Sequence, residues 1–190
     1  NIYVISSNNH GATFNSPVQV NNPADPVTKV NLLPWIAAGP TQGTVGIVWC
    51  GTDHQGNDDN ARWRVYYAQS FNADATTPTF RIAQASDHSI HASNISLKGL
   101  PLTGVAPNRN LIDYFQVNID PQGAAVIGYT DDHSDFNGHT FVSRQISGPS
   151  LNGGSFPAVV EGSALPAQTF ALPGATPPAV VAQYPQPLTP

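Results

Sequence analysis

Short runs rich in apolar and β-branched residues recur along the chain, and Gly, Pro, Asn and Asp separate them. Such runs are typical of β-strands joined by turns. The pattern therefore predicts an all-β fold with almost no helix, and a four-stranded antiparallel unit over about residues 35–84. The expected strands are 2–5, 17–20, 35–38, 44–50, 63–69, 79–83, 114–119, 124–129 and 140–144.

One stretch of this pattern is repeated 80 residues further on. Gly43–Trp49 (GTVGIVW) matches Gly123–Tyr129 (GAAVIGY), and each run ends in an aromatic residue followed by an acidic loop. A second predicted strand follows each loop. A repeated multi-strand unit is typical of propeller blades. The offset is longer than the about 40–50 residues of a usual blade, and we interpret residues 86–111 as an inserted loop.

The composition excludes several classes of function. Only 10% of the residues are charged, and the net charge is −5. Nucleic-acid binding is not expected, because the chain has no cluster of Lys and Arg. No apolar run approaches the roughly 18 residues of a membrane span. Cys50 is the only cysteine, so no internal disulfide can form, and its apolar surroundings predict a buried thiol.

The last quarter of the chain has a different composition. Nine of the 18 prolines lie beyond residue 146, among alanines and scattered apolar residues. We therefore divide the chain into strand-forming residues 1–146 and a Pro/Ala-rich tail, residues 147–190. A flexible linker and a tail docked on a protein surface both fit this composition.

The segment Ser7–Phe14 reads S-x-N-x-G-x-T-F and resembles the Asp box of the sialidase (BNR-repeat) superfamily. In such a hairpin, Gly11 takes a positive φ, and Ser7, Asn9 and Thr13 hydrogen-bond to turn backbone groups. Phe14 is expected to pack the hairpin against its sheet. A degenerate copy runs from Ser70-Phe71-Asn72 to Pro78-Thr79-Phe80.

The resemblance implies a partial sialidase-like β-propeller of about two to three four-stranded blades, the C-terminal part of a larger propeller. It also implies a secreted, extracellular or cell-surface protein. The chain opens with Asn1 and contains no Met, so we expect it to begin inside a longer product. Its partners are then the remaining blades of the same protein or other protein chains.

In a propeller frame, the loops between second and third strands and the connections between blades share one face. Most ionisable residues map to this face, whereas Asp74 and Asp120 map to the opposite one. A ligand site and a set of solvated loops both fit this distribution. The candidate ligand-binding residues are Asp53, His54, Arg62, His88, His91, Arg109, Asp113 and His133.

Two acidic loops offer carboxylate oxygens, the ligands that Ca²⁺ prefers. If their side chains converge, they predict a Ca²⁺ site; if they diverge, they are surface loops. No other cofactor is expected. The candidate ligands are Asp53, Asp58, Asp59, Asp131, Asp132 and Asp135.

The favoured function is a noncatalytic extracellular module for glycan or ligand binding, or for assembly. The alternative is part of a secreted glycoside hydrolase of the exo-sialidase kind, or a lyase acting on glycans. Sialidases of this superfamily use a Tyr nucleophile activated by a Glu. The single glutamate, Glu161, lies in the Pro-rich tail, so no catalytic residue is assigned.

Overall fold

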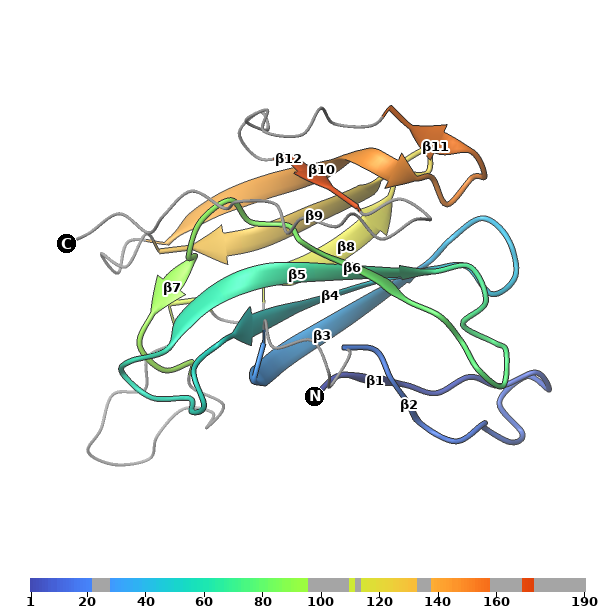
Figure 1. Ribbon diagram of the computed structural model, residues 1–190, viewed down its shortest axis with the longest axis horizontal. Coiled ribbons are helices and arrows are strands. Elements are labelled where there is room, and N and C mark those ends of the chain that lie inside the picture. Colours follow the sequence, from blue (N-terminus) through green and yellow to red (C-terminus); the bar gives the residue numbers. More distant parts are fainter. Residues whose placement is uncertain (22–27, 96–109, 112–113, 133–137, 158–168, 173–190) are drawn as a thin grey trace, which may run out of the picture.

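The computed structural model describes residues 1–21, 28–95, 110–111, 114–132, 138–157 and 169–172. In these residues the chain forms strands and no helix (Figure 1), as the apolar pattern predicts. No helix of the described residues could cross a membrane. The strands are β1 (Tyr3–Val4), β2 (Val18–Gln19), β3 (Val30–Ala38), β4 (Val45–Thr52), β5 (Arg62–Ser70), β6 (Arg81–Gln84), β7 (His91–Ala92), β8 (Phe115–Ile119), β9 (Ala125–Asp131), β10 (His139–Pro149), β11 (Ser155–Phe156) and β12 (Thr169–Ala171).

The strands form three sheets, which are numbered here in chain order. The second sheet is the antiparallel array β3-β4-β5-β6, with β7 paired to the start of β5. It contains the four-stranded unit predicted over residues 35–84, although β3 begins earlier, at Val30. The segment from residue 86 onward is more than an inserted loop, because β7 lies within it and adds to the same sheet.

The third sheet, β8-β9-β10-β11, repeats this order. The turns before β4 and β9 match closely: Gly43 and Gly123 both have a φ of 78°. Each of these glycines accepts a backbone hydrogen bond from the hairpin that follows the third strand of its sheet. The donors are the amides of Ala73 and Leu151, at 2.8 and 2.9 Å. The 80-residue repeat in the sequence is therefore also a repeat in structure.

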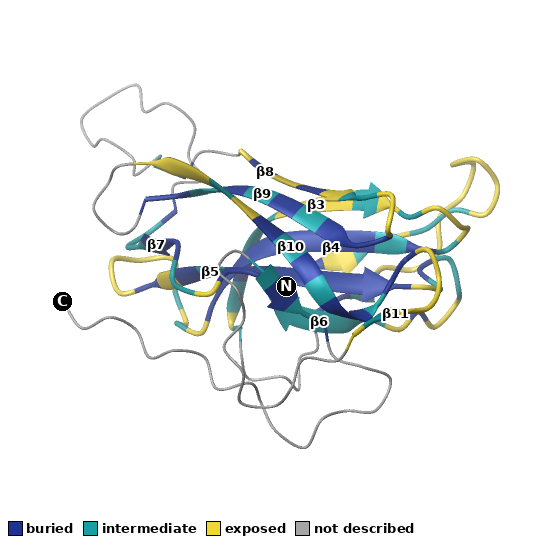
Figure 2. Ribbon diagram, turned by 90° about the horizontal axis from the view of Figure 1, so that it is seen from above, coloured by how far each residue is buried: buried dark blue, intermediate teal, exposed yellow. Residues whose placement is uncertain are grey.

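The first sheet contains only β1 and β2. It lies on one side of the second sheet, and the third sheet lies on the other (Figure 1). Ile2 and Val20 of the first sheet pack with Trp49 and Tyr66, and the opposite face of the second sheet contacts β8 and β9. Figure 2 shows that β4 and β5 are buried along most of their length.

Alternation along the central strands explains these two cores. Side chains of a strand point in turn to opposite faces, so Trp63, Val65 and Tyr67 face the third sheet, whereas Tyr66 and Ala68 face the first. Strands buried on both faces form continuous apolar runs, as β4 does. Cys50 lies in this core, and burial raises the pKa of its thiol to about 12.

The tail does not begin where the change in composition suggests. The division between residues 146 and 147 falls inside β10, which continues to Pro149 and turns into β11. Further on, β12 pairs in parallel with β10, and Phe170 and Leu172 are buried in the main core. The rest of the tail from residue 158 lies outside the described residues. Proline content alone missed these strands, because pairing with β10 depends on a partner distant in sequence.

Candidate functional site

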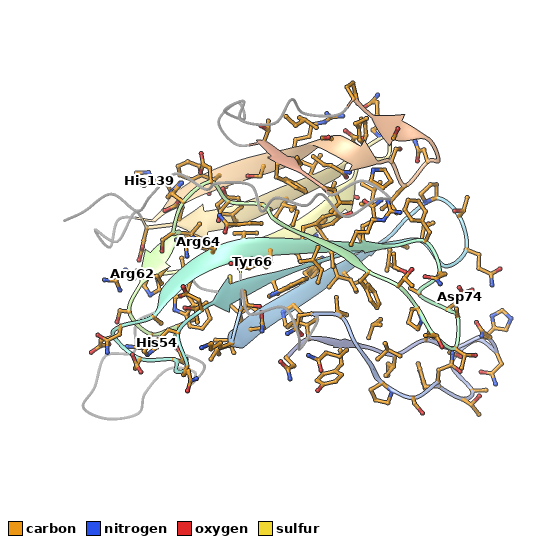
Figure 3. The ribbon with its side chains drawn as sticks, viewed as in Figure 1. His54, Arg62, Arg64, Tyr66, Asp74 and His139 are labelled. Atoms are coloured by element: carbon orange, nitrogen blue, oxygen red, sulfur yellow. The ribbon has the colours of Figure 1, made fainter. Side chains whose placement is uncertain are left out.

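The strands divide the molecule into two chemically different ends. At the hairpin end lie the β1–β2, β5–β6 and β10–β11 hairpins. At the polar end lie the β4–β5, β6–β7 and β9–β10 connections. Figure 3 shows His54, Arg62 and His139 at the polar end and Asp74 at the hairpin end, which is the separation expected from the sequence.

The first hairpin has the internal hydrogen bonds expected for Ser7–Phe14. The Ser7 hydroxyl accepts from the Gly11 amide at 2.8 Å, and Asn9 Oδ1 accepts from the Thr13 amide at 2.9 Å. Asn9 Nδ2 donates to the Thr13 hydroxyl at 2.8 Å. Gly11 has a φ of 84°. The polar residues of the segment therefore stabilise the turn itself.

The second hairpin repeats this arrangement with an insertion. The Asn72 amide donates to the Ser70 hydroxyl at 3.1 Å, and Asn72 Oδ1 accepts from the Thr79 amide at 2.9 Å. The predicted degenerate copy therefore shares with the first the bond from the Asn amide to the Ser hydroxyl and the bond from the Thr amide to the Asn side chain.

A third copy, Ser150-Leu151-Asn152, was missed in the sequence because its glycine-rich turn is one residue shorter. The Asn152 amide donates to the Ser150 hydroxyl at 3.1 Å. The three S-x-N segments thus each open a hairpin at the hairpin end, one in each of the three sheets.

The expectation for Phe14 is wrong. Its side chain is 60% exposed and is not inserted into the sheet. The first sheet has two short strands, and this leaves little apolar surface near the turn for Phe14 to cover. The hairpin is therefore held by its hydrogen bonds and not by an aromatic plug.

At the polar end, His88 bridges two carboxylates. Its Nδ1 lies 2.5 Å from Asp87 Oδ1, and its Nε2 lies 2.5 Å from Asp131 Oδ2. Asp131 is fully buried and comes from β9, whereas His88 follows β6. Hydrogen bonding to Asp131 is the main cause that raises the pKa of His88 to about 9, against the lowering effect of burial, and Asp87 raises it further. His88 is therefore a cation at neutral pH.

A second pair lies beside the first. His91 Nδ1 is 2.6 Å from Asp132 Oδ2, and both side chains are buried. Asn110 Nδ2 donates to the same carboxylate oxygen at 3.2 Å, and the Asp132 amide donates to the carbonyl of Ile90 at 3.1 Å. His91 Nε2 faces the carbonyl of Asn94 at 3.1 Å.

These contacts join the second sheet to the third at the polar end. Asp131 and Asp132 belong to the third sheet, and His88 and His91 belong to the connection around β7. Buried carboxylates are stable only with partners that replace water. Each imidazole has acceptors at both ring nitrogens, so each ring is occupied by hydrogen bonds within the protein. The arrangement holds the second and third sheets together, and it leaves neither ring nitrogen for a substrate or metal.

The other acidic loop makes local contacts. His54 Nε2 lies 2.9 Å from Asp58 Oδ2, and this hydrogen bond, with the Asn60 amide, lowers the pKa of Asp58. Asp59 accepts from Ser93 and Asn94, and these two bonds lower its pKa. The loop is thereby tied to the turn after β7.

The remaining candidates divide into two groups. Asp53 and Arg62 are exposed at the polar end. Arg109, Asp113, His133 and Asp135 lie outside the described residues. In the described part of the chain no three His, Cys, Asp or Glu side chains form a group that could hold a metal. Asp58, Asp59, Asp131 and Asp132 instead bind side chains of the protein, and the Ca²⁺ site stays a prediction.

The sequence interpretation also missed several residues at this end. It did not name Asp87 or Asn94 as candidates, although they contact the two histidines. The spacing His88-x-x-His91 was visible, but the buried carboxylates that contact these histidines, Asp131 and Asp132, lie 41 or more residues away.

The fold and the polar end together define an all-β protein of stacked antiparallel sheets with a histidine–carboxylate interface. Comparison with known proteins adds no relative: no protein-family model, no curated protein and no solved structure matches the chain.

Proposed function

We propose that this chain is part of a sialidase-like β-propeller and serves as a noncatalytic, extracellular module that binds glycans. One observation carries the proposal: three S-x-N hairpins stand at the same end of three stacked sheets. Radial repetition of a sheet with a conserved hairpin position is the principle of a propeller. The second and third sheets supply two blades, and the first supplies the outer half of another.

The blade interpretation is supported by how the sheets pack. The second sheet buries apolar side chains on both faces, as an internal blade requires. The first strands of the second and third sheets, β3 and β8, lie in contact, which is the relationship expected of innermost strands.

A noncatalytic role is supported by the chemistry of the polar end. His88 and His91 have both ring nitrogens engaged, so neither is available as a general base. Exposed polar side chains such as Asp53 and Arg62 remain for ligand contacts. The loops of this end are the ligand-binding part of the proposal, and the hairpin end is its framework.

Further sheets complete the proposed assembly. The first sheet has two strands where the others have five, and it exposes Tyr3 and Ile5, with 55% and 52% of their surfaces accessible. Isolated two-stranded sheets are marginally stable. Blades of the same protein or of another chain are the proposed neighbours of this face.

The test is a binding and turnover screen with residues 1–190. Immobilised neutral and acidic polysaccharides are offered to the protein, and binding is followed by biolayer interferometry. Amide hydrogen exchange of the complex then locates the ligand. We expect saturable binding to at least one polysaccharide, with protection at the polar end and none at the hairpin end.

The same preparations are assayed for release of reducing sugar, unsaturated product and sialic acid. We expect no turnover above buffer. Cleavage of any polysaccharide would establish the alternative, a glycoside hydrolase or lyase, and absence of binding to the whole panel would reject the glycan-binding module.

A further inference from the structure

Three of the seven Lys and Arg residues gather on one face of the second sheet. Arg62 and Arg64 alternate with Trp63, which faces the third sheet, so both point to the face that carries Tyr66 and the first sheet. Lys29, just before β3, is bonded through its amide to the carbonyl of Thr52 and is exposed. Three cations thus lie on this face of a chain with net charge −5, and the exposed Asp53 follows β4 at the same end.

A buried, unpaired donor stands on the same face. Asn31 is 6% exposed; its Oδ1 accepts from Trp49 Nε1 at 2.7 Å, but its Nδ2 has no hydrogen-bond partner. Buried polar atoms are rarely left unpaired. An orphan N–H donor beside cations is chemically suited to an anionic acceptor.

The strand register places these groups in one row. Asn31 is opposite Gly51 on β4, and Gly51 is opposite Arg64 on β5. The two outer residues of the row are about 10 Å apart, from the usual spacing of strands. Gly51 has no side chain, and Thr28 and the Tyr66 ring cover its position: a Cβ there would stand 2.8 Å from both Thr28 Cγ2 and Tyr66 Cδ2.

Within the part of the chain that the structure describes, no ion pair neutralises the charges of this face. Among the described residues, the ion pairs join His54 to Asp58, His88 to Asp87 and Asp131, His91 to Asp132, and Arg144 to Asp120. None of them involves Lys29, Arg62 or Arg64. The first sheet packs on this face too, in a cluster that contains Ile47, Ala68, Trp49 and Tyr66.

We propose that the basic face, formed by Lys29, Asn31, Arg62 and Arg64, binds the carboxylate or sulfate groups of an acidic polysaccharide. This rests on the glycan-binding function proposed above and specifies its ligand class. Guanidinium groups hold planar oxyanions through two parallel N–H···O bonds, and Asn31 Nδ2 is a neutral donor without a partner on the same face.

A polysaccharide fits this face better than a nucleic acid. Nucleic-acid affinity depends on neutralising many phosphates, and the overall negative charge of the protein opposes the approach of such a polyanion. A polysaccharide with spaced anionic groups needs few cations at any one place. Arg62 and Arg64, two residues apart on β5, are separated by about 7 Å along the strand.

The experiment measures the dissociation constants of residues 1–190 for polygalacturonate, dextran sulfate, neutral dextran and poly-glutamate. We expect polygalacturonate or dextran sulfate to bind, with affinity that decreases as salt is raised, and the other two to bind far more weakly. The carboxylate and sulfate probes separate the two sources of negative charge.

Two variants and one control assign the site. Arg64→Gln removes one cation and should raise the dissociation constant at least about tenfold, the effect of losing one hydrogen bond to a charged group. Asn31→Asp keeps the acceptor for Trp49 but replaces the free donor with a negative oxygen, and should abolish binding. Arg81→Gln makes the same charge change on β6 and should leave binding unaltered.

Several results would overturn the inference. Equal binding of poly-glutamate would make the face a general anion or acidic-peptide site. Preference for neutral dextran, or equal losses in Arg64→Gln and Arg81→Gln, would reject the basic face while leaving glycan binding intact. Absence of binding to every polysaccharide would reject the proposed function as well. Circular dichroism of each variant confirms that it is folded.

Discussion

His91 and Asp132, 41 residues apart in the chain, form a buried pair in which Nδ1 lies 2.6 Å from Oδ2. The pair joins the connection around β7 to the end of β9. Removing one member of a buried, hydrogen-bonded pair leaves the other without its partner. The contact is therefore a sensitive point in the packing of the second sheet on the third.

Asp132→Asn should lower the free energy of unfolding by about 3–5 kcal/mol, the usual effect of breaking a buried pair. The measurement is urea unfolding followed by tryptophan fluorescence. Asp53→Asn is the control, because Asp53 is exposed and should change the stability by less than about 0.5 kcal/mol. Similar stabilities for the two variants would show that the pair contributes nothing.

Stability should also depend on pH through His88. Its pKa rises from 6.5 to about 9 on folding, so the protonated ring stabilises the folded state. This contribution is complete below about pH 6.5 and disappears as the pH rises through about 9. Among the described residues, the groups that face the ring are Asp87, Asp131 and the ring of Phe141.

The measurement compares the unfolding midpoints of the wild type and His88→Gln from pH 6 to pH 10. We expect the wild type to be more stable at pH 6 and the difference to diminish above about pH 9. A difference that grows with pH, or stays constant over the range, would contradict the assignment of the cation to His88.

The turn glycine of the third sheet should not tolerate a side chain. Gly123 has a φ of 78°, and a Cβ there would stand 2.5 Å from the amide nitrogen of Asn152. Gly123→Ala should therefore destabilise the protein by more than about 1 kcal/mol. Gly128→Ala is the control, since nothing lies within 4 Å of its Cβ position. Thermal melts compare the two variants. Equal melting temperatures would show that a side chain at position 123 causes no strain.

The thiol of Cys50 should react only when the protein unfolds. It is 2% exposed, and its raised pKa keeps it protonated at neutral pH. Modification by a chromogenic disulfide reagent should be slow in buffer and rapid in denaturant. Reaction at the same rate in both conditions would show that the surrounding core opens readily.

Much of the local structure was predictable because its causes lie close together in the sequence. Alternating and continuous apolar runs identified the central strands, and Ser7, Asn9 and Thr13 identified a hairpin whose hydrogen bonds span four residues or fewer. The separation of polar and hairpin ends also followed, since strands that alternate in direction place successive connections at opposite ends.

Pairings between sheets could not be read in this way. Asp131 and Asp132 resemble metal ligands in the sequence, and only the stacking of the third sheet on the second brings them to His88 and His91. The same holds for Asn31 and Arg64, which share a row through strand register.

Composition and pattern along the chain thus determined that this protein is all-β, where its main strands lie and how its turns close. The tertiary structure decided which carboxylates neutralise which histidines, that Phe14 remains exposed, and that part of the proline-rich tail adds a parallel strand to β10. The physical reason is the distance along the chain over which each kind of interaction acts. Turn hydrogen bonds and strand propensity act over a few residues, whereas burial and charge pairing depend on surfaces that meet only after the sheets have stacked.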